Sequence, residues 1–224
     1  SAGTEKDYEP KNYDGKFRGP VTLRQALAQS LNVPSVKVLR DLAGLEDSVR
    51  QARDMGITTL DKPSSFYGLS LVLGGGEVKL LDMVSAYGVF ATKGLRIPPS
   101  AVLKIEDNEG NILEENRKTP KRVLEKEVAD LINSILSDNQ ARAPIFGLNS
   151  SMHINNYEVA AKTGTTQDYK DGWIIGYSPS LVAGVWTGNN DNSLMRHQPG
   201  AVVAGRIWKQ FMEKALLKYP KENF

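Results

Sequence analysis

Three short apolar runs near the carboxyl end of this 224-residue sequence constrain its fold more than any other feature. Residues 157–163, 172–178 and 181–187 each have the length and composition of a β-strand. The connections between them are only eight and two residues long. Parallel neighbours would need a crossover of about a dozen residues or more, so connections this short predict an antiparallel meander.

Helical patterns dominate the sequence before these strands. Thr22 has the chemistry of a helix N-cap, and the residues after it carry apolar side chains at helical spacing. Pro34 is well placed at the start of a second helix, and residues 45–56 predict a third helix that ends in glycine. Residues 125–139 form a further amphipathic pattern.

These patterns divide the sequence into consecutive regions. Residues 1–20 are rich in proline, glycine and charge and predict an extended lead-in. A mainly helical block follows over residues 21–140, with a hairpin near 100–115. The three sheet strands occupy residues 157–187, and residues 202–217 predict a closing helix. The predicted fold class is α/β, of the α+β kind, with a helical block and an antiparallel sheet.

Composition excludes several classes of function. The 28 basic and 26 acidic residues are interspersed and leave a net charge of +2, so nucleic acid is not an expected partner. No apolar stretch reaches the ~18–20 residues that a membrane span needs, so we expect no span in this chain. Cysteine is absent, and the two histidines, His153 and His197, lack metal-ligand spacing. We therefore expect no metal site and no cofactor.

The first of the three strands ends in a polar motif, Lys162-Thr163-Gly164-Thr165-Thr166. Strand side chains alternate, so we expect the lysine, the glycine and the last threonine on one face and the other two threonines on the opposite face. A glycine lets a ligand approach the backbone, whose N–H groups can bind an incoming carbonyl oxygen. Threonine hydroxyls and a lysine ammonium can bind a carboxylate. The motif predicts a site for an acyl group that has a terminal carboxylate.

The segment "AAKTGTTQDYKDGWIIGYSPSLVAGVWTGNND", which contains this motif, resembles the third signature region of class A penicillin-binding proteins. The earlier segment "NYDGKFRGPVTLRQALAQSLNVPSVKVL" resembles the same family and contains its second signature, serine-any-asparagine, as Ser30-Leu31-Asn32. The likeness covers essentially the whole chain. It implies the transpeptidase fold that penicillin-binding proteins share with serine β-lactamases.

A second serine-any-asparagine triplet, Ser137-Asp138-Asn139, competes for this role. It lies only 25 residues before Lys162, whereas Ser30 lies 132 residues before it. The long separation and the following Val-Pro pair match the family pattern, which favours Ser30. We expect the later triplet to be the ragged end of a surface helix.

The family's first signature, serine-any-any-lysine, supplies the nucleophilic serine, and it is absent here. None of the 16 serines has a lysine three residues later, although Ser100 has Lys104 four residues later. The resemblance therefore implies the C-terminal part of a transpeptidase domain, without its N-terminal strands and nucleophile helix. We expect a companion segment or chain to carry the nucleophilic serine and to cover the free edge of strand 181–187, and we expect the fragment alone to be inactive.

The resemblance implies a penicillin-binding D,D-transpeptidase that cross-links peptidoglycan through an acyl-serine. Three residues would be catalytic: Ser30 would relay protons, Asn32 would hold the substrate amide, and Lys162 would polarise the Ser30 hydroxyl. The substrate-binding residues would be Thr163, Gly164, Thr165 and Thr166. Among these, the first and third would bind the terminal carboxylate, and the Thr165 N–H would be one oxyanion donor.

The expected partners are peptidoglycan stem peptides that end in D-Ala-D-Ala and the β-lactam antibiotics that mimic them. The expected location is the outer face of the bacterial cytoplasmic membrane, on the periplasmic or cell-wall side, with an anchor in a segment missing from this sequence. Two alternatives stay open: a serine β-lactamase or D,D-carboxypeptidase, and a non-catalytic peptidoglycan-binding module. The class A-like flanks disfavour the first, and the intact Ser30, Asn32 and Lys162 disfavour the second.

Overall fold

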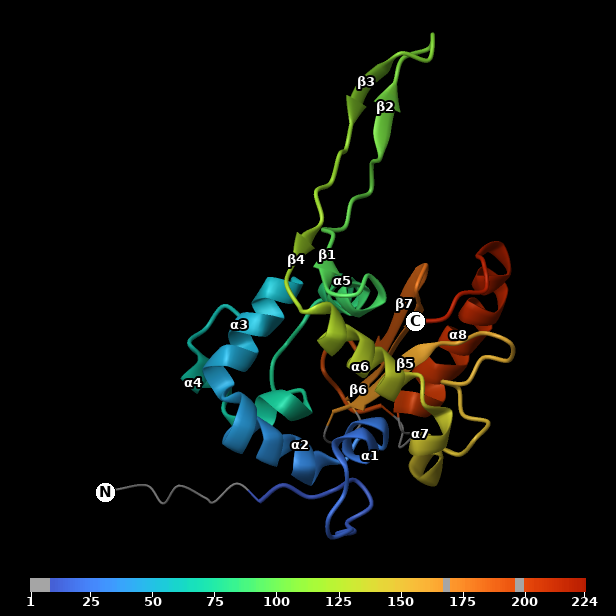
Figure 1. Cartoon of the computed structure of the whole chain (residues 1–224). Coiled ribbons are helices and arrows are strands. Elements are labelled where there is room, and N and C mark those ends of the chain that lie inside the picture. Colours follow the sequence, from blue (N-terminus) through green and yellow to red (C-terminus); the bar gives the residue numbers. More distant parts are fainter. Residues whose placement is uncertain (1–8, 167–169, 196–199) are drawn as a thin grey trace.

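The computed structural model describes residues 9–166, 170–195 and 200–224. Figure 1 shows a central sheet between a block of helices and a long C-terminal helix, with a hairpin arm that projects from the body. The helices are α1 Leu23–Ala28, α2 Asn32–Val38, a π-helix Leu39–Ala43, α3 Leu45–Met55, α4 Ser64–Tyr67, a 3-10 helix Leu69–Leu73, α5 Leu80–Ala91, α6 Lys126–Leu136, α7 Asn139–Phe146, α8 Gly200–Ala215 and a 3-10 helix Leu216–Lys218. The strands are β1 Leu95–Arg96, β2 Lys104–Glu106, β3 Ile112–Glu115, β4 Lys121–Arg122, β5 Ala160–Thr165, β6 Asp171–Ser178 and β7 Leu181–Gly188.

The three strands near the carboxyl end form one antiparallel sheet in the order β5-β6-β7. Thr163 of β5 lies opposite Ile174, which in turn lies opposite Val185 of β7. The predicted meander and the mixed fold class are confirmed. Because β6 lies in the middle, β5 and β7 each have one edge that no described strand covers.

One face of this sheet packs on α8. Trp208 of α8 is fully buried, and its Nε1 donates to the Ala183 carbonyl at 3.0 Å. Gly176 permits this close approach, since a Cβ atom at that position would lie 2.2 Å from Cζ2 of Trp208. The indole therefore lies directly on the sheet backbone, where it joins α8 to both β6 and β7.

The opposite face packs on α5 and α6, which Figure 1 shows across the sheet from α8. Tyr177 is fully buried on this face, and its hydroxyl donates to Oδ1 of Asn133 at 2.7 Å. Asn133 in turn donates to the Phe90 carbonyl at 3.0 Å. Buried polar atoms are costly without partners, so this network both satisfies them and fixes the helical block on the sheet.

The arm consists of β2 and β3, which form the predicted hairpin (Figure 1). Asp107 closes its turn by accepting from the backbone N–H groups of Glu109 and Asn111. At the base of the arm, β1 and β4 pair with Leu95 opposite Arg122, a pairing that the sequence did not predict. Within the described part of the chain, no helix combines the length and apolar character that crossing a membrane requires.

Two helix boundaries differ from the prediction. The second helix begins at Asn32 rather than Pro34, because Oδ1 of Asn12 accepts from the Val33 N–H at 3.2 Å and satisfies a donor of the first turn. Pro34 still lies in that turn, where its missing N–H costs no helical hydrogen bond. The predicted helix over residues 125–139 is shorter in the structure: α6 ends at Leu136, and Asn139 is already the first residue of α7.

Ser137-Asp138-Asn139 lies at a helix end as expected, since Ser137 is the C-cap of α6, but the expectation that this end is ragged is wrong. Asp138 is the N-cap of α7, and its Oδ1 accepts from the Ala141 N–H at 2.8 Å. This side chain satisfies one of the donors that every helix leaves unpaired at its start. The triplet is therefore a tight corner between two ordered helices.

We expect Gly176→Ala to destabilise the protein by about 1–3 kcal/mol, because the new methyl group overlaps the Trp208 ring. The matched control is Gly88→Ala in α5, where an added Cβ meets no heavy atom within 4 Å. Alanine is favoured over glycine inside a helix by about 0.5–1 kcal/mol, so the control should not lose stability. Thermal unfolding measures both variants, and equal melting temperatures would contradict the close contact between α8 and β6.

Candidate active site

Ser30 lies just after α1 in a left-handed backbone conformation, with φ of 57°. Its N–H donates to the Leu27 carbonyl at 3.1 Å, and the Leu31 N–H donates to the Ala26 carbonyl at 2.9 Å. This pair of hydrogen bonds defines a Schellman motif, whose left-handed position is most often glycine. A serine there carries backbone strain of about 1 kcal/mol or more, and such strain is concentrated at functional sites.

The turn brings the Ser30 hydroxyl to Lys162 of β5. Nζ of Lys162 donates to Oγ of Ser30 at 2.6 Å and to the Thr163 carbonyl at 2.7 Å. The contact joins residues 132 positions apart, one from the helical block and one from the sheet. Because the ammonium is the donor, the hydroxyl hydrogen of Ser30 is free to point toward another acceptor.

Burial changes the proton affinity of Lys162. Desolvation of this half-buried side chain, together with a smaller effect of the positive charge of Arg142, lowers the pKa of its ammonium to about 8. A lysine with this pKa exchanges its proton close to neutral pH, which an ordinary exposed lysine does not do. The pair can therefore hold or release a proton in the range where enzymes work.

The open edge of β5 runs past this pair. Along a strand, the N–H and C=O groups of alternate residues point to opposite edges. The Thr163 carbonyl bonds the Lys162 side chain, and the Thr166 N–H pairs with the Asp171 carbonyl across the hairpin. The backbone groups of Thr165 therefore face the same open edge as those of Thr163.

The other predicted residues lie around this edge in different ways. Thr163 is buried on the α8 face of the sheet, opposite Ile174, and Thr165 is half-buried on that same face. Gly164 lies on the Lys162 face, where a Cβ atom would lie 3.3 Å from that of Trp173. The alternation of faces follows the expectation for this strand.

Two predicted residues have hydrogen bonds that point away from Lys162. Nδ2 of Asn32 donates to the Lys11 carbonyl at 2.8 Å and so holds the lead-in segment against α2. Oγ1 of Thr166 bonds the Asp171 carboxylate at 3.0 Å and accepts from the Asp171 N–H at 2.9 Å. The structure thus brings Ser30, Lys162 and Thr163 together, while Asn32 contacts the lead-in and the Thr166 side chain closes the β5–β6 hairpin.

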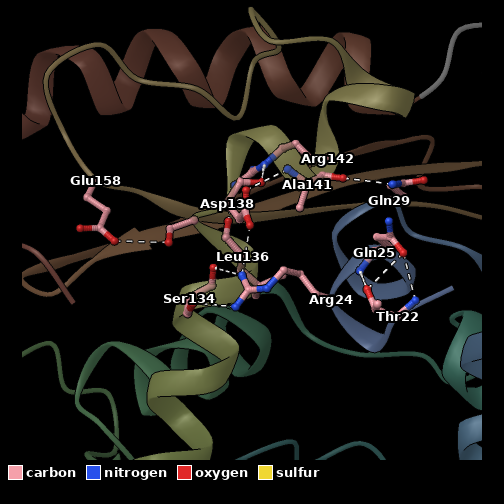
Figure 2. Close-up of polar contacts among 11 residues, drawn as sticks. Thr22, Arg24, Gln25, Gln29, Ser134, Leu136, Asp138, Ala141, Arg142 and Glu158 are labelled. Carbon is pink, nitrogen blue, oxygen red and sulfur yellow. Dashed lines mark hydrogen bonds and ion pairs between the residues drawn. The ribbon is translucent and has the colours of Figure 1, made fainter.

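The corner between α6 and α7 adds residues that the sequence interpretation missed. Figure 2 shows Arg142 and Asp138 on this corner, with Gln29 of the α1 turn directed at Ala141. Nε2 of Gln29 donates to the Ala141 carbonyl at 3.1 Å, so the residue just before Ser30 is fixed to α7. Arg142 is almost completely buried, at 2% exposure. The only feature of the sequence that could have indicated this corner is Asp138, because aspartate is a favoured helix N-cap.

No group of three or more histidine, aspartate and glutamate side chains within the described ranges could hold a metal ion. His153 lies in the loop before β5. The other histidine, His197, lies outside the described residues.

This fold and this serine–lysine pair define a transpeptidase domain, and the comparisons identify its family. Residues 1–213 match the family described as the penicillin-binding protein transpeptidase domain. The chain belongs to this family of serine-type transpeptidases, and its similarity to class A members extends over nearly its whole length.

Individual relatives agree with this assignment. The chain is 38% identical to penicillin-binding protein 1A of Aquifex aeolicus and 34% identical to penicillin-binding protein 2D of Bacillus subtilis. The alignments cover 98% and 97% of this chain but only 29% and 31% of those relatives. The chain therefore spans less than a third of the length of these two curated relatives.

Solved structures show the same fold. The PonA1 protein of Mycobacterium tuberculosis in complex with penicillin V superimposes with a TM-score of 0.82 at 28% identity, over 96% of this chain and 61% of that one. Penicillin-binding protein 1A of Haemophilus influenzae gives a TM-score of 0.83 at 26% identity, over 100% of this chain and 38% of that one.

The strained turn at Ser30 generates a test on stability. Ser30→Ala and Ser30→Gly both remove the hydroxyl, but only the glycine also removes the Cβ atom that disfavours the left-handed conformation. We expect the glycine variant to be more stable than the alanine variant by about 1 kcal/mol. Chemical denaturation would measure this difference, and a more stable alanine variant would contradict the proposed strain.

Proposed function

We propose that this chain carries part of the active site of a peptidoglycan-cross-linking D,D-transpeptidase, namely the residues of the second and third family signatures. The observation that supports the proposal most directly is the 2.6 Å contact between Nζ of Lys162 and Oγ of Ser30, at the open edge of β5. Membership of the penicillin-binding transpeptidase family supports the same reaction class.

The proposed reaction has two acyl-transfer steps. A nucleophilic serine forms a bond to the carbonyl carbon of the penultimate D-alanine, and the peptide bond to the last D-alanine breaks. That D-alanine leaves as an amine, which must gain a proton. An amine of a neighbouring stem peptide then attacks the acyl-serine, forms the new amide and returns the proton to the serine oxygen.

Ser30 and Lys162 serve the proton transfers. Ser30 accepts a hydrogen bond from Lys162, so its own hydrogen can be donated to the leaving amine. Lys162 then replaces that proton and adds positive potential beside the developing negative charge. Asn32, at the start of α2 and two residues after Ser30, would hold the substrate amide once its present contact to the Lys11 carbonyl gives way.

The strand edge serves substrate binding. The hydroxyls of Thr163 and Thr165 would bind the terminal carboxylate of the stem peptide, and the Thr165 N–H would be one donor to the oxyanion. Gly164 would let the acyl group lie against the backbone. Thr166 would contribute by holding the end of β5 in place, since its hydroxyl bonds Asp171.

The nucleophile would come from a companion segment, because none of the serines in this sequence has a lysine three residues later. The uncovered edge of β7 supports this arrangement, since a free strand edge favours pairing with another strand. An apolar hollow of about 190 Å³ beside Val182 of β7, between α5 and β1, would accommodate side chains of such a segment. The complete protein would act on the outer face of the bacterial cytoplasmic membrane, anchored through a further segment.

β-Lactam antibiotics would enter the site as mimics of D-Ala-D-Ala. The similar PonA1 structure holds penicillin V, which supports binding of the same class of compound by the completed domain. The penicillin would acylate the companion serine while its carboxylate binds the β5 threonines.

In the complete protein, Lys162→Ala should lower the rate of acylation by a fluorescent penicillin about 100- to 1,000-fold, the typical loss for one electrostatic contact in an active site. Labelling kinetics followed on a gel would measure it. Lys170→Ala, on the neighbouring β5–β6 connection, is the control and should label normally. Unchanged labelling of Lys162→Ala would remove this residue from the site.

Residues 1–224 alone should form no covalent adduct with a β-lactam in intact-mass spectra, because the nucleophile is supplied elsewhere. The same experiment on the protein with its companion segment should show one adduct. An adduct on any serine of residues 1–224 would overturn the proposed division of the active site.

A further inference from the structure

The hairpin arm is a sheet of only two strands. β2 and β3 pair with each other, and every residue of both strands is exposed. Figure 1 shows that the arm projects away from the helical block and the central sheet. A hairpin of two strands is marginally stable in water, and three or more strands with an apolar face are needed for independent stability. The arm therefore gains stability from any further strand that pairs with it.

The hydrogen bonds between β2 and β3 show which backbone groups are already paired. The Leu103 carbonyl accepts from the Asn116 N–H at 2.8 Å, and the Asp107 N–H donates to the Asn111 carbonyl at 3.0 Å. Leu103 and Asp107, at the two ends of β2, thus direct their backbone groups at the neighbouring strand.

The open edge of β2 belongs to Lys104 and Glu106. Backbone groups of successive residues point to opposite edges of an antiparallel strand, so these two residues direct theirs away from β3. No described strand pairs with this edge. The outer edge of β3 is less available, because the Glu115 carbonyl accepts from the Arg117 N–H at 3.0 Å. The arm therefore offers β2 as its free edge.

The two faces of β2 differ in chemistry. Side chains alternate along a strand, so Lys104 and Glu106 share one face, where they form an ion pair. Leu103 and Ile105 share the other face, and their exposed fractions are 71% and 44%. An uncovered apolar face beside a free strand edge favours pairing with another strand.

The charges on this edge select the partner. Charged side chains on a free edge normally oppose pairing, but Lys104 and Glu106 have opposite signs and lie two positions apart. When two copies of β2 pair antiparallel about Ile105, each Lys104 lies opposite the partner's Glu106. A pair centred on Lys104 or on Glu106 would instead place like charges opposite each other, which is destabilising. The register about Ile105 is therefore the one that uses the whole of β2.

We propose that the β2 edge of the arm is a self-association surface, through which two copies of the protein join their arms into one antiparallel sheet in the order β3-β2-β2-β3. The proposal rests on the self-complementary sequence Lys104-Ile105-Glu106 along an open edge. It does not depend on the proposed acyl-transfer function, because the arm contributes no residue to that site. The paired strand is short, so association is weak and increases with protein concentration.

This pairing satisfies both the backbone and the side chains of β2. Lys104 and Glu106 exchange backbone hydrogen bonds with the partner's Glu106 and the partner's Lys104. Ile105 lies opposite the partner's Ile105 in a non-hydrogen-bonded pair, the kind in which side chains lie closer together. The apolar faces of the two arms then form one continuous surface, and the charges alternate in sign on the other face.

The length of the arm leaves room for the pairing. The turn residue Glu109 lies four positions after Ile105, whereas Arg96, the last residue of β1, lies nine positions before it. In an antiparallel pair, the tip of each arm therefore stops short of the base of the other arm.

The first test is a disulfide across the two-fold axis in the complete protein. Cα atoms of a non-hydrogen-bonded antiparallel pair lie about 4.5 Å apart, within the range that a disulfide spans. We expect Ile105→Cys to form a covalent dimer under mild oxidation, mapped by mass spectrometry to position 105. Ile112→Cys is the matched control, since it replaces another exposed isoleucine of the arm but on the outer strand, β3. This sequence contains no cysteine, and any in the rest of the protein is first replaced by serine.

The second test reverses the charges. Lys104→Glu and Glu106→Lys each place like charges opposite each other twice in a dimer, so each should weaken association about tenfold or more in sedimentation experiments. A mixture of the two variants should associate like the wild type, because every substituted residue then faces the opposite charge. Arg117→Glu, which reverses a charge of the same arm after the outer strand, should leave association unchanged.

The outcomes separate the possible partners of the edge. A disulfide at position 105 but not at position 112, together with association of the mixed charge variants that neither shows alone, supports the proposal. The recovery in the mixture also shows that both variants are folded. A wild type that stays monomeric at every concentration and forms no disulfide through Ile105→Cys overturns it, and this is the result expected if the companion segment or another protein covers β2. Wild-type association of either single charge variant also overturns it.

Discussion

The hydrogen bond between the Lys162 ammonium and the Ser30 hydroxyl is the interaction on which the site depends. Its two residues belong to separate parts of the fold, a helix end and a sheet strand, and 132 positions separate them. Each part has its own apolar core. The distance between the two groups is therefore set by how the helical block docks on the sheet, through contacts such as the buried hydrogen bond from Tyr177 to Asn133.

The sheet is a rigid support with one functional edge. Trp208 packs on Gly176 from one side, and α5 and α6 cover the other, so β6 cannot shift without breaking a packed layer. The open edge of β5 is also rigid, because every residue from Ala160 to Thr165 is paired with β6. Preorganised backbone donors on such an edge need little reorganisation when a substrate carbonyl arrives.

The site also contains features that cost stability. Ser30 occupies a left-handed position suited to glycine, and Lys162 and Arg142 place two positive charges in a poorly hydrated region. A strained backbone position and a poorly compensated buried charge each lower the free energy of unfolding. The strained Ser30 and the Lys162 ammonium with its lowered pKa meet at one hydrogen bond, which is consistent with a site in which strain and electrostatics serve proton transfer.

The sequence determined the local features: three strands joined by short turns, the Thr22 cap, the hairpin, and alternating faces along the Lys162 motif. These depend on neighbours within a few residues, which a sequence shows directly. The choice of Ser30 rather than Ser137 as the partner of Lys162 came from family resemblance. Only the tertiary structure showed that the Ser30 and Lys162 side chains are in contact. The structure alone showed α7, which is short, contains Pro144 and lacks a clear apolar period, and the burial of Arg142. Burial and long-range electrostatics depend on how segments far apart in the sequence pack together, and a local sequence pattern does not determine that packing.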